Sequence, residues 1–588
     1  MKKILFMVLS ILISLSAVSA FQPNNKTEIV YQIMIDRFYD GNPDNNFKID
    51  KINPNAYHGG DIEGIIKKIN YLENLGITAL LLSPFNDNRD LEFFGSYGFH
   101  GYWIKDFYKI EEHFGVEKDL KKLSDALKSK GIKLIIDIVL NHVEWDAELK
   151  RSNAGWFNDK GDIKNWNLQE EVESGNMGGL PDFNQNNPEV YDYLLNMTKY
   201  WIKKSGCSGI RLDAVKHVPI NFWKKFIRDI NDFAVEEKIP DFIIIGEVLH
   251  GDIFYLKNYY NAGISELFDF PLYYKIIESI AKSGNLSLVA NLINNDAVYP
   301  ENSKQAIFID NHDVPRFYSS AGENIDKLKL ALGLIFTLRG TPVIYYGTEC
   351  PLKGIDENSG RTEMIFDPEP LLYDYIKKLI SIRKNNKSLA EGKFIELYKS
   401  GDLLAFARVL ENEESIIALN NSESEKNFTF DLFQNSLLKS EILTDLLNGD
   451  TISIENNKVS ISLSPRSIKV FVKKHPNPVY KNFLLSLNAK KEDASIRWYV
   501  KNDKTKFGQQ IYICGNTGEL GGWNPEKAAG PFSCPDWPVW TFELKLPASK
   551  FIEYKFILKD GKKTDWESGE NRSLKIDKNE IEIKTEWR

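Results

Sequence analysis

Eight short apolar segments, separated by amphipathic ones, constrain the fold of this chain most. The apolar segments are residues 29–35, 79–83, 133–140, 209–213, 242–247, 266–270, 306–309 and 342–346. Most are continuous apolar runs, which is typical of strands buried on both faces. The segments 62–75, 117–130, 189–204 and 324–338 lie between them and have the periodicity of helices. Repeated alternation of strand and helix indicates a parallel sheet, and eight repeats predict an α/β fold of the closed (β/α)₈ TIM-barrel type.

One interval between predicted strands is much longer than a single helix requires. It runs from His142 to Gly209, and its first part is polar and rich in Trp, Asn and Gly. Long segments of this kind inside a compact domain are usually functional insertions. We therefore predict a small inserted domain at 143–185 within a barrel that spans 21–387.

The pattern changes to short strands beyond residue 388. Segments 403–409, 415–419, 459–463 and 467–472 predict an antiparallel β-sandwich domain over 388–473. The sequence KKHPNP at 473–478 is typical of a linker, which we predict to span 474–492. Strands at 496–500, 510–514, 540–546 and 553–558 predict a second β-sandwich at 493–588. Six of the 12 tryptophans fall within the last 91 residues, which indicates a surface that needs specially placed indoles.

The first twenty residues have the pattern of a signal peptide. A basic start (MKK) precedes an apolar stretch at 4–15 and the small residues of the Val18-Ser19-Ala20 cleavage pattern. We expect residues 1–20 to be removed and the mature chain to be secreted, with an uncleaved membrane anchor as the alternative. In an oxidising compartment Cys514 and Cys534 could pair, which the sequence does not decide.

Composition narrows the possible partners. Lysine and arginine total 74 against 82 acidic residues, a formal net charge of −8, which argues against a broad basic surface for nucleic acid. We expect no nucleic-acid partner, no membrane contact in the mature form, and a monomer.

Three acidic residues follow three predicted strands, at the ends that face the active site of such a barrel. They are Asp213, Glu247 and Asp313, and Arg211 lies on the same side of its strand as Asp213. A pair of carboxyl groups, one ionised and one protonated, is what glycoside hydrolysis requires. We expect the Arg211 cation to keep Asp213 ionised as a nucleophile. The apolar run before Glu247 is expected to raise its pKa, which suits a general acid.

Six motifs surround these residues. They are DIVLNH at 137–142, GIRLDAVKH at 209–217, GEV at 246–248, FIDNHD at 308–313, LPDFN at 180–184 and YGFHGYW at 97–103. The first four resemble, in order and spacing, the signature regions of the α-amylase family (glycoside hydrolase family 13). The other two resemble the family's motif at the end of inserted domain B and its aromatic–histidine motif. The resemblance covers residues 28–473 and implies a catalytic barrel followed by β domain C.

The resemblance implies a role for each matching residue. Asp213 would be the nucleophile, Glu247 the acid/base, and Asp313 would stabilise the transition state. Sugar contacts are implied for His100, Tyr102, His142, Arg211, Lys216, His217, His312 and Arg361. The loop that holds Asp356 and Arg361 departs from the family pattern, because it is one residue longer. Retention of configuration follows, with carboxyl groups about 5–5.5 Å apart.

The resemblance also implies calcium as a cofactor. One site would use Asn141, Asp182 and the backbone carbonyl of His217, which are hard oxygen ligands. A second segment resembles a site of cyclodextrin glucanotransferase-like members, with the implied ligands Asp40, Asn42, Asn45, Asn46 and Asp61. An Asx-rich turn without metal is the alternative for that segment.

The C-terminal domain has its own resemblance. Segments 506–525 and 551–572 resemble the opening and close of a family 20 starch-binding module. The residues implied for glucan binding are Trp523 and Trp566 as a stacking platform, with Lys555, Glu567 and Asn571 beside them. Phe507 occupies a position where the second glucan-binding site of such modules usually has Tyr. Whether this second site binds glucan therefore stays open. We expect Trp540 to lie in the core.

We therefore expect a secreted, retaining α-amylase that cleaves internal α-1,4 bonds of starch and malto-oligosaccharides. A cyclodextrin glucanotransferase, or a maltogenic or cyclodextrin-degrading amylase, is the alternative. The glucanotransferases carry an extra immunoglobulin-like domain, and the short interval from Val472 to Asp493 leaves no room for one. A starch-capture protein without catalysis would be expected to lack at least one of the three acids, and all are present.

Overall fold

The computed structural model describes residues 28–588 except 94, 167, 439–440, 490–492, 507, 548–550, 562 and 577–579. The predicted signal peptide and the predicted binding residue Phe507 therefore lie outside the described residues. Within the described part of the chain, no helix has both the length and the apolar character needed to cross a bilayer.

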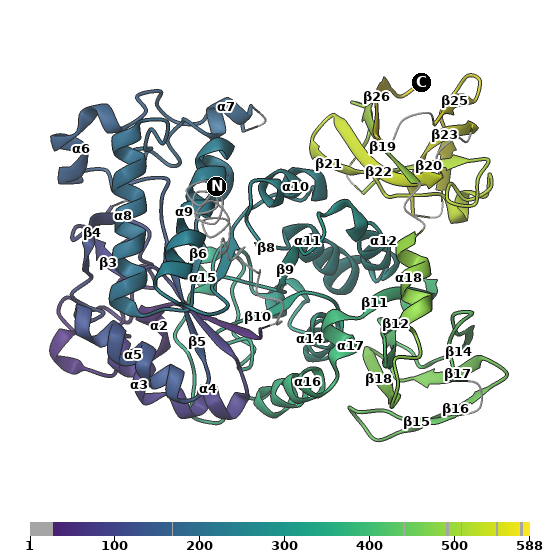
Figure 1. Ribbon diagram of the computed structural model, residues 1–588, viewed down its shortest axis with the longest axis horizontal. Helices are drawn as coiled ribbons and strands as arrows, with labels where there is room; N and C mark the ends of the chain where they lie inside the picture. Colours follow the sequence, from purple (N-terminus) through teal and green to yellow (C-terminus); the bar gives the residue numbers. More distant parts are fainter. Residues whose placement is uncertain are drawn as a thin grey trace, which may run out of the picture.

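Eight parallel strands close into the predicted barrel (Figure 1), in the order β1-β10-β9-β8-β7-β6-β5-β2, with β1 also paired to β2. They are β1 (Val30–Ile33), β2 (Ala79–Leu82), β5 (Lys133–Ile138), β6 (Gly209–Leu212), β7 (Ile243–Gly246), β8 (Glu266–Phe268), β9 (Lys304–Ile307) and β10 (Thr341–Tyr345). All eight fall within or overlap the predicted segments, so the predicted fold class is confirmed. Most strands end before the predicted segments do, which leaves Asp213, Glu247 and Asp313 on loops beyond the ladder.

The predicted helices surround this barrel. They are α3 (Ile62–Lys67) with α4 (Ile69–Leu75), α5 (Glu117–Ser129), α8 (Pro188–Ser205) and α14 (Ile325–Thr337), joined by α9 (Ile220–Glu236), α10 (Ile253–Asn261), α11 (Phe270–Ile276), α12 (Ser287–Asn294) and α16 (Tyr373–Asn385). The single helix predicted at 62–75 is two helices that meet at Lys68. Apolar residues at helical spacing, such as Leu120, Leu123 and Leu127 of α5, are fully buried against the barrel.

The inserted domain lies between β5 and α8, as predicted. It contains the short helices α6 (Glu148–Ser152) and α7 (Gln169–Val172) and little other regular structure. An isolated bridge between His142 and Asp182 ties its beginning to its end. A second excursion, the hairpin β3 (Asn86–Asn88) and β4 (Ile104–Ile110), lies between β2 and α5. Both excursions leave the barrel at the carboxyl ends of its strands, where they can shape a site.

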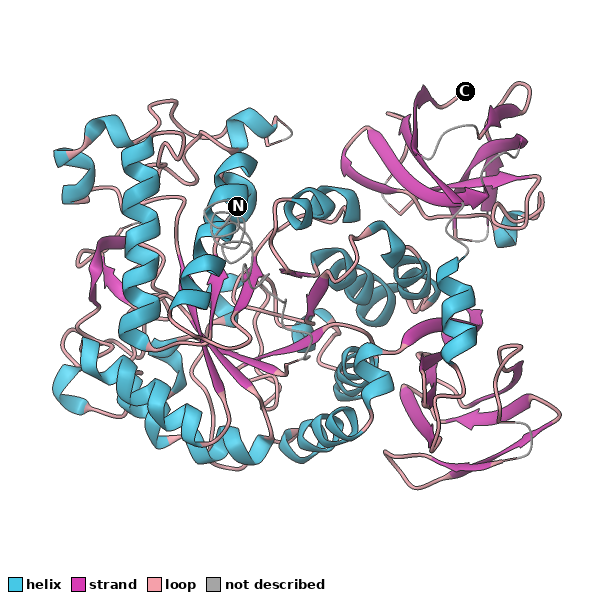
Figure 2. Cartoon of the chain, in the orientation of Figure 1, coloured by secondary structure: helices cyan, strands magenta, loops and turns pink. Residues whose placement is uncertain are grey.

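The domain after the barrel consists of two antiparallel sheets, as predicted (Figure 2). One contains β11 (Lys393–Ser400), β12 (Leu403–Leu410), β13 (Glu413–Asn420) and β18 (Ser467–Lys474), and the other β14 (Lys426–Asp431), β17 (Lys458–Leu463), β16 (Thr451–Glu455) and β15 (Ile442–Thr444). Strands of the second sheet alternate buried and exposed residues, which places one face on a core and the other in solvent.

The predicted linker at 474–492 is wrong in its central part, which forms helix α18 (Lys481–Ala489). Tyr480, at the start of this helix, is buried and its hydroxyl donates a hydrogen bond to Glu414. Phe483 and Leu484 pack on the same apolar cluster as Tyr480. The proline-rich segment that suggested a linker ends β18, and the spacing of Tyr480, Phe483 and Leu484 lets the next residues form an amphipathic helix.

The C-terminal domain is the predicted sandwich. Its strands are β19 (Asp493–Lys501), β20 (Gln510–Gly515), β21 (Ser533–Asp536), β22 (Val539–Pro547), β23 (Phe551–Asp560), β24 (Lys563–Trp566), β25 (Arg572–Lys575) and β26 (Glu580–Glu586). One sheet has the order β21-β22-β19-β26, and the other contains β20, β23, β24 and β25. The first and last strands, β19 and β26, run parallel and side by side. Trp498 and Trp540 lie in the core, as expected for Trp540.

This domain contacts the barrel directly (Figure 1). The Arg497 guanidinium lies over the Phe254 ring of α10, 3.9 Å from its centroid. Asn291 of α12 donates to the carbonyl of Gly530 over 2.7 Å, and Lys545 donates to the carbonyl of Ala297 over 2.9 Å. The terminal domain is therefore placed by contacts with barrel helices as well as by its chain connection.

Candidate active site

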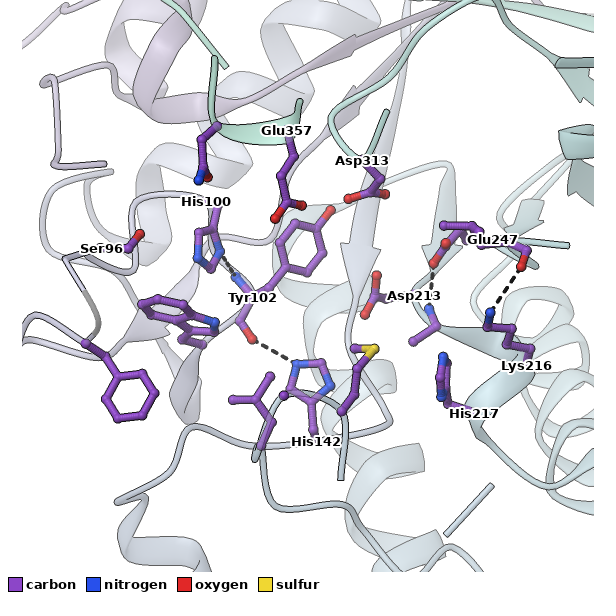
Figure 3. Close-up of a pocket in the computed structure, with 18 of the residues that line it drawn as sticks. Ser96, His100, Tyr102, His142, Asp213, Lys216, His217, Glu247, Asp313 and Glu357 are labelled. Atoms are coloured by element: carbon purple, nitrogen blue, oxygen red, sulfur yellow. Dashed lines mark hydrogen bonds between the residues drawn. The ribbon is translucent and has the colours of Figure 1, made fainter. Parts of the chain in front are cut away.

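A cleft of about 640 Å³ opens at the carboxyl ends of the barrel strands. The sequence-predicted residues that line it are His100, Tyr102, His142, Asp213, Lys216, His217, Glu247, Asp313 and Arg361. Figure 3 shows Asp213, Glu247 and Asp313 facing the same space, with Tyr102 beside them. The fold thus brings together acids that are separated by 100 residues in the sequence, because each follows a strand of one closed barrel.

One guanidinium connects the acids. Arg211 Nη1 lies 2.7 Å from Asp213 Oδ1 and 2.7 Å from Asp137 Oδ2, and Arg211 Nη2 lies 3.2 Å from Glu247 Oε2. Glu247 Oε2 also accepts a hydrogen bond from the backbone N–H of Ala214 over 2.9 Å. Because the Arg211 side chain is 1% exposed, its charge acts on these carboxylates with little screening by water.

The sequence-based assignment of Arg211 as a sugar contact is therefore wrong. Its side chain is buried among Asp137, Asp213 and Glu247, whose carboxylates contact Nη1 and Nη2. Asp137, at the end of β5, is the residue that sequence reasoning did not assign. It also accepts a hydrogen bond from the Tyr102 hydroxyl over 2.8 Å, so it positions both Arg211 and the predicted stacking ring.

Burial dominates the proton affinities of the two central acids. Desolvation raises the pKa of Glu247, as predicted for a general acid, while Arg211 opposes the rise. Desolvation also raises the pKa of Asp213, and repulsion from Glu247 and Asp137 adds to it, although Arg211 acts to lower it. Arg211 thus favours the ionised form of Asp213, as expected, while burial and the neighbouring acids oppose it.

Asp313 is the most accessible of the three acids, with 23% of its side chain exposed. His312 Nε2 lies 3.1 Å from Asp313 Oδ2 and 2.7 Å from the Tyr102 hydroxyl, and Gln32 donates to His312 Nδ1. Both ring nitrogens of His312 therefore have protein partners. His312 is not among the residues that line the cleft; it contacts Tyr102 and Asp313, and its contact with sugar stays a prediction.

The remaining histidines of the site are held neutral by burial. Desolvation lowers the pKa of His142 to about 4 and of His217 to about 3, and it lowers the pKa of His100 as well. A neutral imidazole can donate from one nitrogen and accept at the other, which suits contact with hydroxyl groups. Lys216 donates to the carbonyl of Leu249 over 3.1 Å, and its ammonium lies 5.7 Å from the Trp166 ring.

The loop after the eighth strand differs from the predicted arrangement. Its extra residue forms a turn of helix, α15 (Glu357–Gly360), and the Asp356 carboxylate caps that turn by accepting the Ser359 N–H. Asp356 therefore does not line the cleft, whereas Glu357 does. Arg361 keeps its predicted place, donating to the carbonyl of His312 over 3.0 Å and lying 3.6 Å from Asp313.

Aromatic residues that sequence reasoning did not assign form one wall of the cleft. Phe93 stacks on Trp145 with ring centroids 3.8 Å apart, and Trp103 meets Trp145 edge to face at 4.9 Å. Trp166, 52% exposed, also lines the cleft from the inserted domain. Rings exposed in a cleft suit the apolar faces of sugars. The tryptophan content of the inserted segment was the available signal, but it did not show which rings face the cleft.

The arrangement of oxygen atoms shows how well calcium fits each of the predicted sites. The side-chain oxygen of Asn141 faces the His217 carbonyl oxygen and Asp182 Oδ1, 3.1 Å from each, and turning the amide over would make two hydrogen bonds instead. Asp182 is fully buried, and desolvation raises its pKa to about 8. Three converging oxygens around a buried carboxylate without a cation fit a calcium ion.

The second predicted position fits less completely. The side-chain oxygens of Asn45 and Asn46 are buried without hydrogen-bond partners among the described residues, as cation ligands would be. Asp61, however, caps α3 by accepting the Gly64 N–H, and it also accepts the N–H groups of Gly41 and Asn42. Asn46 donates to Asp40 over 2.8 Å. The turn is therefore already stabilised by its own hydrogen bonds, in keeping with the alternative of an Asx-rich turn.

The predicted platform of the C-terminal domain is assembled by the fold. The Trp523 and Trp566 rings lie 6.3 Å apart with an interplanar angle of 36°, and Trp566 is 40% exposed. Lys555 is anchored beside them by the carbonyl of Gly569 at 2.7 Å, and Asn571 is exposed. Glu567 contradicts its assignment, because it is 2% exposed and pairs with Arg572 at 2.8 Å. Its carboxylate holds the loop and does not face solvent.

Family models match three parts of the chain. "Alpha amylase, catalytic domain" matches residues 32–368, more than half of the chain. The chain belongs to the α-amylase family. "Alpha-amylase C-terminal domain" matches residues 392–471, and "Starch binding domain" matches residues 493–585, so the two β domains are those of a family member with a starch-binding module.

Curated relatives of this family member have two activities in their names. A "Beta/alpha-amylase" of Paenibacillus polymyxa is 34% identical over 76% of the chain, and the chain spans 38% of that relative. A "Cyclomaltodextrin glucanotransferase" of Klebsiella oxytoca is 30% identical over 93% of the chain and 92% of the relative.

Solved structures divide in the same way. An Anoxybacillus α-amylase is 37% identical with a TM-score of 0.71, covering 76% of this chain and 98% of that one. A cyclomaltodextrin glucanotransferase described as having a three-domain ABC distribution is 29% identical with a TM-score of 0.69, covering 76% of this chain and 100% of that one. The comparisons thus establish the family and leave the reaction within it to the site.

Proposed function

We propose that this family member is an α-amylase that hydrolyses internal α-1,4 bonds of starch with retention of configuration. The observation that carries the proposal is the contact of two cleft carboxyls, Asp213 and Glu247, with the single guanidinium of Arg211. This contact holds the two groups close enough together to flank one glycosidic bond, as a double displacement requires. The exposed tryptophans of the terminal module support starch as the substrate.

Each acid has a distinct part in the proposed reaction. Glu247, whose pKa burial raises, gives its proton to the oxygen of the departing sugar. Asp213, beside the Arg211 guanidinium, attacks the anomeric carbon as a carboxylate and forms a glycosyl-enzyme as the bond to the departing oxygen breaks. The Glu247 carboxylate then takes a proton from water, which hydrolyses the glycosyl-enzyme and restores both groups. Asp313 contacts sugar hydroxyls, and Tyr102 stacks on the sugar ring.

Product analysis tests the proposal. The full chain is incubated with soluble starch, and products are separated by size and by sensitivity to an exo-acting glucoamylase. Linear malto-oligosaccharides of mixed length, released with the α configuration, are expected. Cyclic products would overturn the hydrolytic assignment in favour of the glucanotransferase, and the absence of any product would favour a starch-capture protein.

The glucanotransferase remains the second candidate, because one such enzyme aligns over 92% of its length with this chain. The missing immunoglobulin-like domain does not exclude it, since a similar glucanotransferase is described as having three domains. The higher identities to an amylase relative and an amylase structure, 34% and 37%, favour hydrolysis. The rates on cyclodextrins and on starch should also be compared. A cyclodextrin-degrading amylase would open cyclodextrins faster than it cleaves starch.

We also propose that the chain is exported after removal of residues 1–20. In addition, we propose one calcium ion, held by Asn141, Asp182 and the carbonyl of His217. Calcium there would link the inserted domain to the barrel and neutralise the buried Asp182 carboxylate. The second site stays a prediction, with the ligands Asp40, Asn42, Asn45, Asn46 and Asp61. If it binds calcium, a chelator should still lower the stability of the Asp182→Asn variant.

A further inference from the structure

The aromatic wall of the cleft, formed by Phe93, Trp103 and Trp145, comes from two separate excursions of the chain. Phe93 and Trp103 belong to the excursion between β2 and α5, whereas Trp145 belongs to the inserted domain. The Phe93 and Trp145 rings stack where the two excursions meet, with centroids 3.8 Å apart. The wall therefore presents a continuous face to a glucan chain only while the two excursions keep one relative position.

The Arg89 side chain connects the two excursions beside this wall. Arg89 follows β3, and its Nη1 lies 2.7 Å from Glu144 Oε2 and 2.8 Å from Asp146 Oδ2. These two acids come directly before and after Trp145 in the sequence. The guanidinium carbon also lies 5.3 Å from the ring centroid of Phe93 and 5.9 Å from that of Trp145. Arg89 thus contacts both rings of the stack and both sequence neighbours of one of them.

The burial of this ion-pair cluster is uneven. The side chains of Arg89 and Glu144 are 11% and 6% exposed, whereas that of Asp146 is 67% exposed. Desolvation acts to lower the pKa of Arg89, but hydrogen bonds to Asp146 and Glu144 raise it overall, so the guanidinium stays charged and paired. None of these three residues is among the described residues that line the cleft. Arg89 can therefore act on a bound glucan only through the aromatic rings that it holds.

We propose that Arg89 is a positioning residue that keeps Phe93 and Trp145 stacked as a binding surface for the glucan chain, and thereby sets the affinity of the cleft for malto-oligosaccharides. This inference rests on the proposed function and names a determinant of substrate affinity in the same site. Stacking of sugar on these rings stabilises the bound substrate and the transition state alike. Its loss therefore raises KM and leaves kcat unchanged.

Two replacements of Arg89 separate its charge from its bulk. Methionine keeps an unbranched apolar side chain without charge. Lysine keeps the charge, and one ammonium group can replace Nη1, the single nitrogen that makes both ion pairs. Both variants should fold, because the backbone N–H of Glu144 also donates to the carbonyl of Ile104 over 3.0 Å and so joins the same two excursions.

Lys105→Met is the matched control for the loss of a cation from this part of the chain. Lys105 lies on β4 and pairs with Asp87 at 2.9 Å and with Asp90 at 2.6 Å. Both acids belong to the same excursion as Lys105, so these ion pairs do not connect it to the inserted domain.

Steady-state kinetics of the full chain on maltoheptaose test the proposal. Arg89→Met should raise KM about three- to tenfold, the contribution of one aromatic contact, with kcat within about twofold of the parent. Arg89→Lys and Lys105→Met should keep the parental KM. The proposal is overturned by a parental KM in Arg89→Met, by an equal rise in Lys105→Met, or by equal KM values in the two Arg89 variants. If Arg89→Met does not fold, Asp146→Ala, which removes the exposed acid, decides by the same rise in KM.

Failure of the proposed function would be recognised separately, because the parent chain itself would not cleave maltoheptaose. The Kd for maltoheptaose, measured by quenching of tryptophan fluorescence, then replaces KM. Trp566→Ala is added to the parent and to every variant, so that the terminal module contributes less to binding. The expected pattern is the same, with Kd raised about three- to tenfold by Arg89→Met alone. Equal Kd values with and without Arg89→Met would overturn the positioning role.

Discussion

At the scale of single residues, Arg211 determines the electrostatics of the cleft. One buried cation serves three carboxyl groups, those of Asp137, Asp213 and Glu247, so at least one of them is favoured to hold a proton. Burial raises the pKa of each of the three acids. An acid/base pair with one shared proton is therefore a consequence of having fewer positive than negative groups in a dry site.

Replacing Asp213 by Asn should remove the proposed nucleophile while keeping the shape of the cleft. We expect kcat on soluble starch to fall by roughly 10³-fold or more, as for other residues that form a covalent bond to substrate. Circular dichroism and thermal unfolding check that the fold is kept. Activity at the parental level would rule out Asp213 as the nucleophile.

Lys216 offers a test of the general acid through pH. Glu247 must be protonated to act, so activity declines as pH rises through its pKa. The Lys216 ammonium lowers the pKa of Glu247, and Lys216→Met should therefore move the alkaline limb of kcat/KM to higher pH. Lys216→Arg, which keeps the charge, is the control. A limb at the same pH in parent and Met variant would contradict the assignment of Glu247.

At the scale of elements, the inserted domain is held at its two ends and also at α7, where Gln169 donates to the carbonyl of Lys216 over 3.1 Å. Its interior has little regular structure, whereas the His142–Asp182 bridge and the Asn141 contacts lie where it leaves and rejoins the barrel. Since this domain supplies Trp166 and other residues of the cleft wall, the clasp at its base also fixes the substrate-facing surface.

Removal of calcium should loosen this clasp. With the proposed calcium at about 100 times its Kd, binding adds about 2.7 kcal/mol to stability, so chelation should lower Tm by roughly 2–4 °C in a chain of this size. Scanning calorimetry with and without a chelator measures the difference. The Asp182→Asn variant should lose most of this difference in Tm. A full effect of the chelator on that variant would place the calcium ion elsewhere.

Sequence reasoning was most successful for elements with strong periodicity. The eight barrel strands and the acids that follow them could be predicted, because buried parallel strands are continuous apolar runs and barrel sites lie at strand ends. It did not identify α18, whose short apolar stripe follows a proline-rich segment. It also misassigned Arg211 and Glu567, since a motif gives the residue at a position but not whether that side chain faces substrate or a neighbouring ion.

At the scale of the whole molecule, the starch-binding module is docked on the barrel helices. The Arg497–Phe254 contact and two hydrogen bonds from Asn291 and Lys545 fix its position. Figure 1 shows α18 between the module and domain C, and the module meets the barrel helices directly. A fixed module holds a bound glucan chain at a constant distance from the cleft.

Trp566→Ala tests the binding surface of this module. Loss of one stacking ring should weaken adsorption to granular starch about three- to tenfold, because an aromatic contact contributes about 0.5–1.5 kcal/mol beyond its buried area. The rate on soluble malto-oligosaccharides should stay at the parental level. Unchanged adsorption would show that glucan binds at another face, for which the exposed Trp537 is the first candidate.

Arg497→Ala tests the docking itself. We expect a lower rate on granular starch, an unchanged rate on soluble starch, and a larger radius of gyration by small-angle X-ray scattering. Lys584→Ala is the matched control, because Lys584 also lies over an aromatic ring, that of Tyr499, but within the module. Equal scattering curves for the two variants and the parent would mean that Arg497 does not hold the module in place.

The parallel pairing of β19 with β26 has a practical consequence for attaching the protein to a surface. The chain enters the module at the start of β19 and leaves it at the end of β26, so entry and exit lie at opposite ends of the same pair of strands. Nine residues of β19 span roughly 30 Å. An affinity handle fused after Arg588 would therefore extend from the far end of the module, and beads carrying the immobilised protein should leave the cleft open to solution.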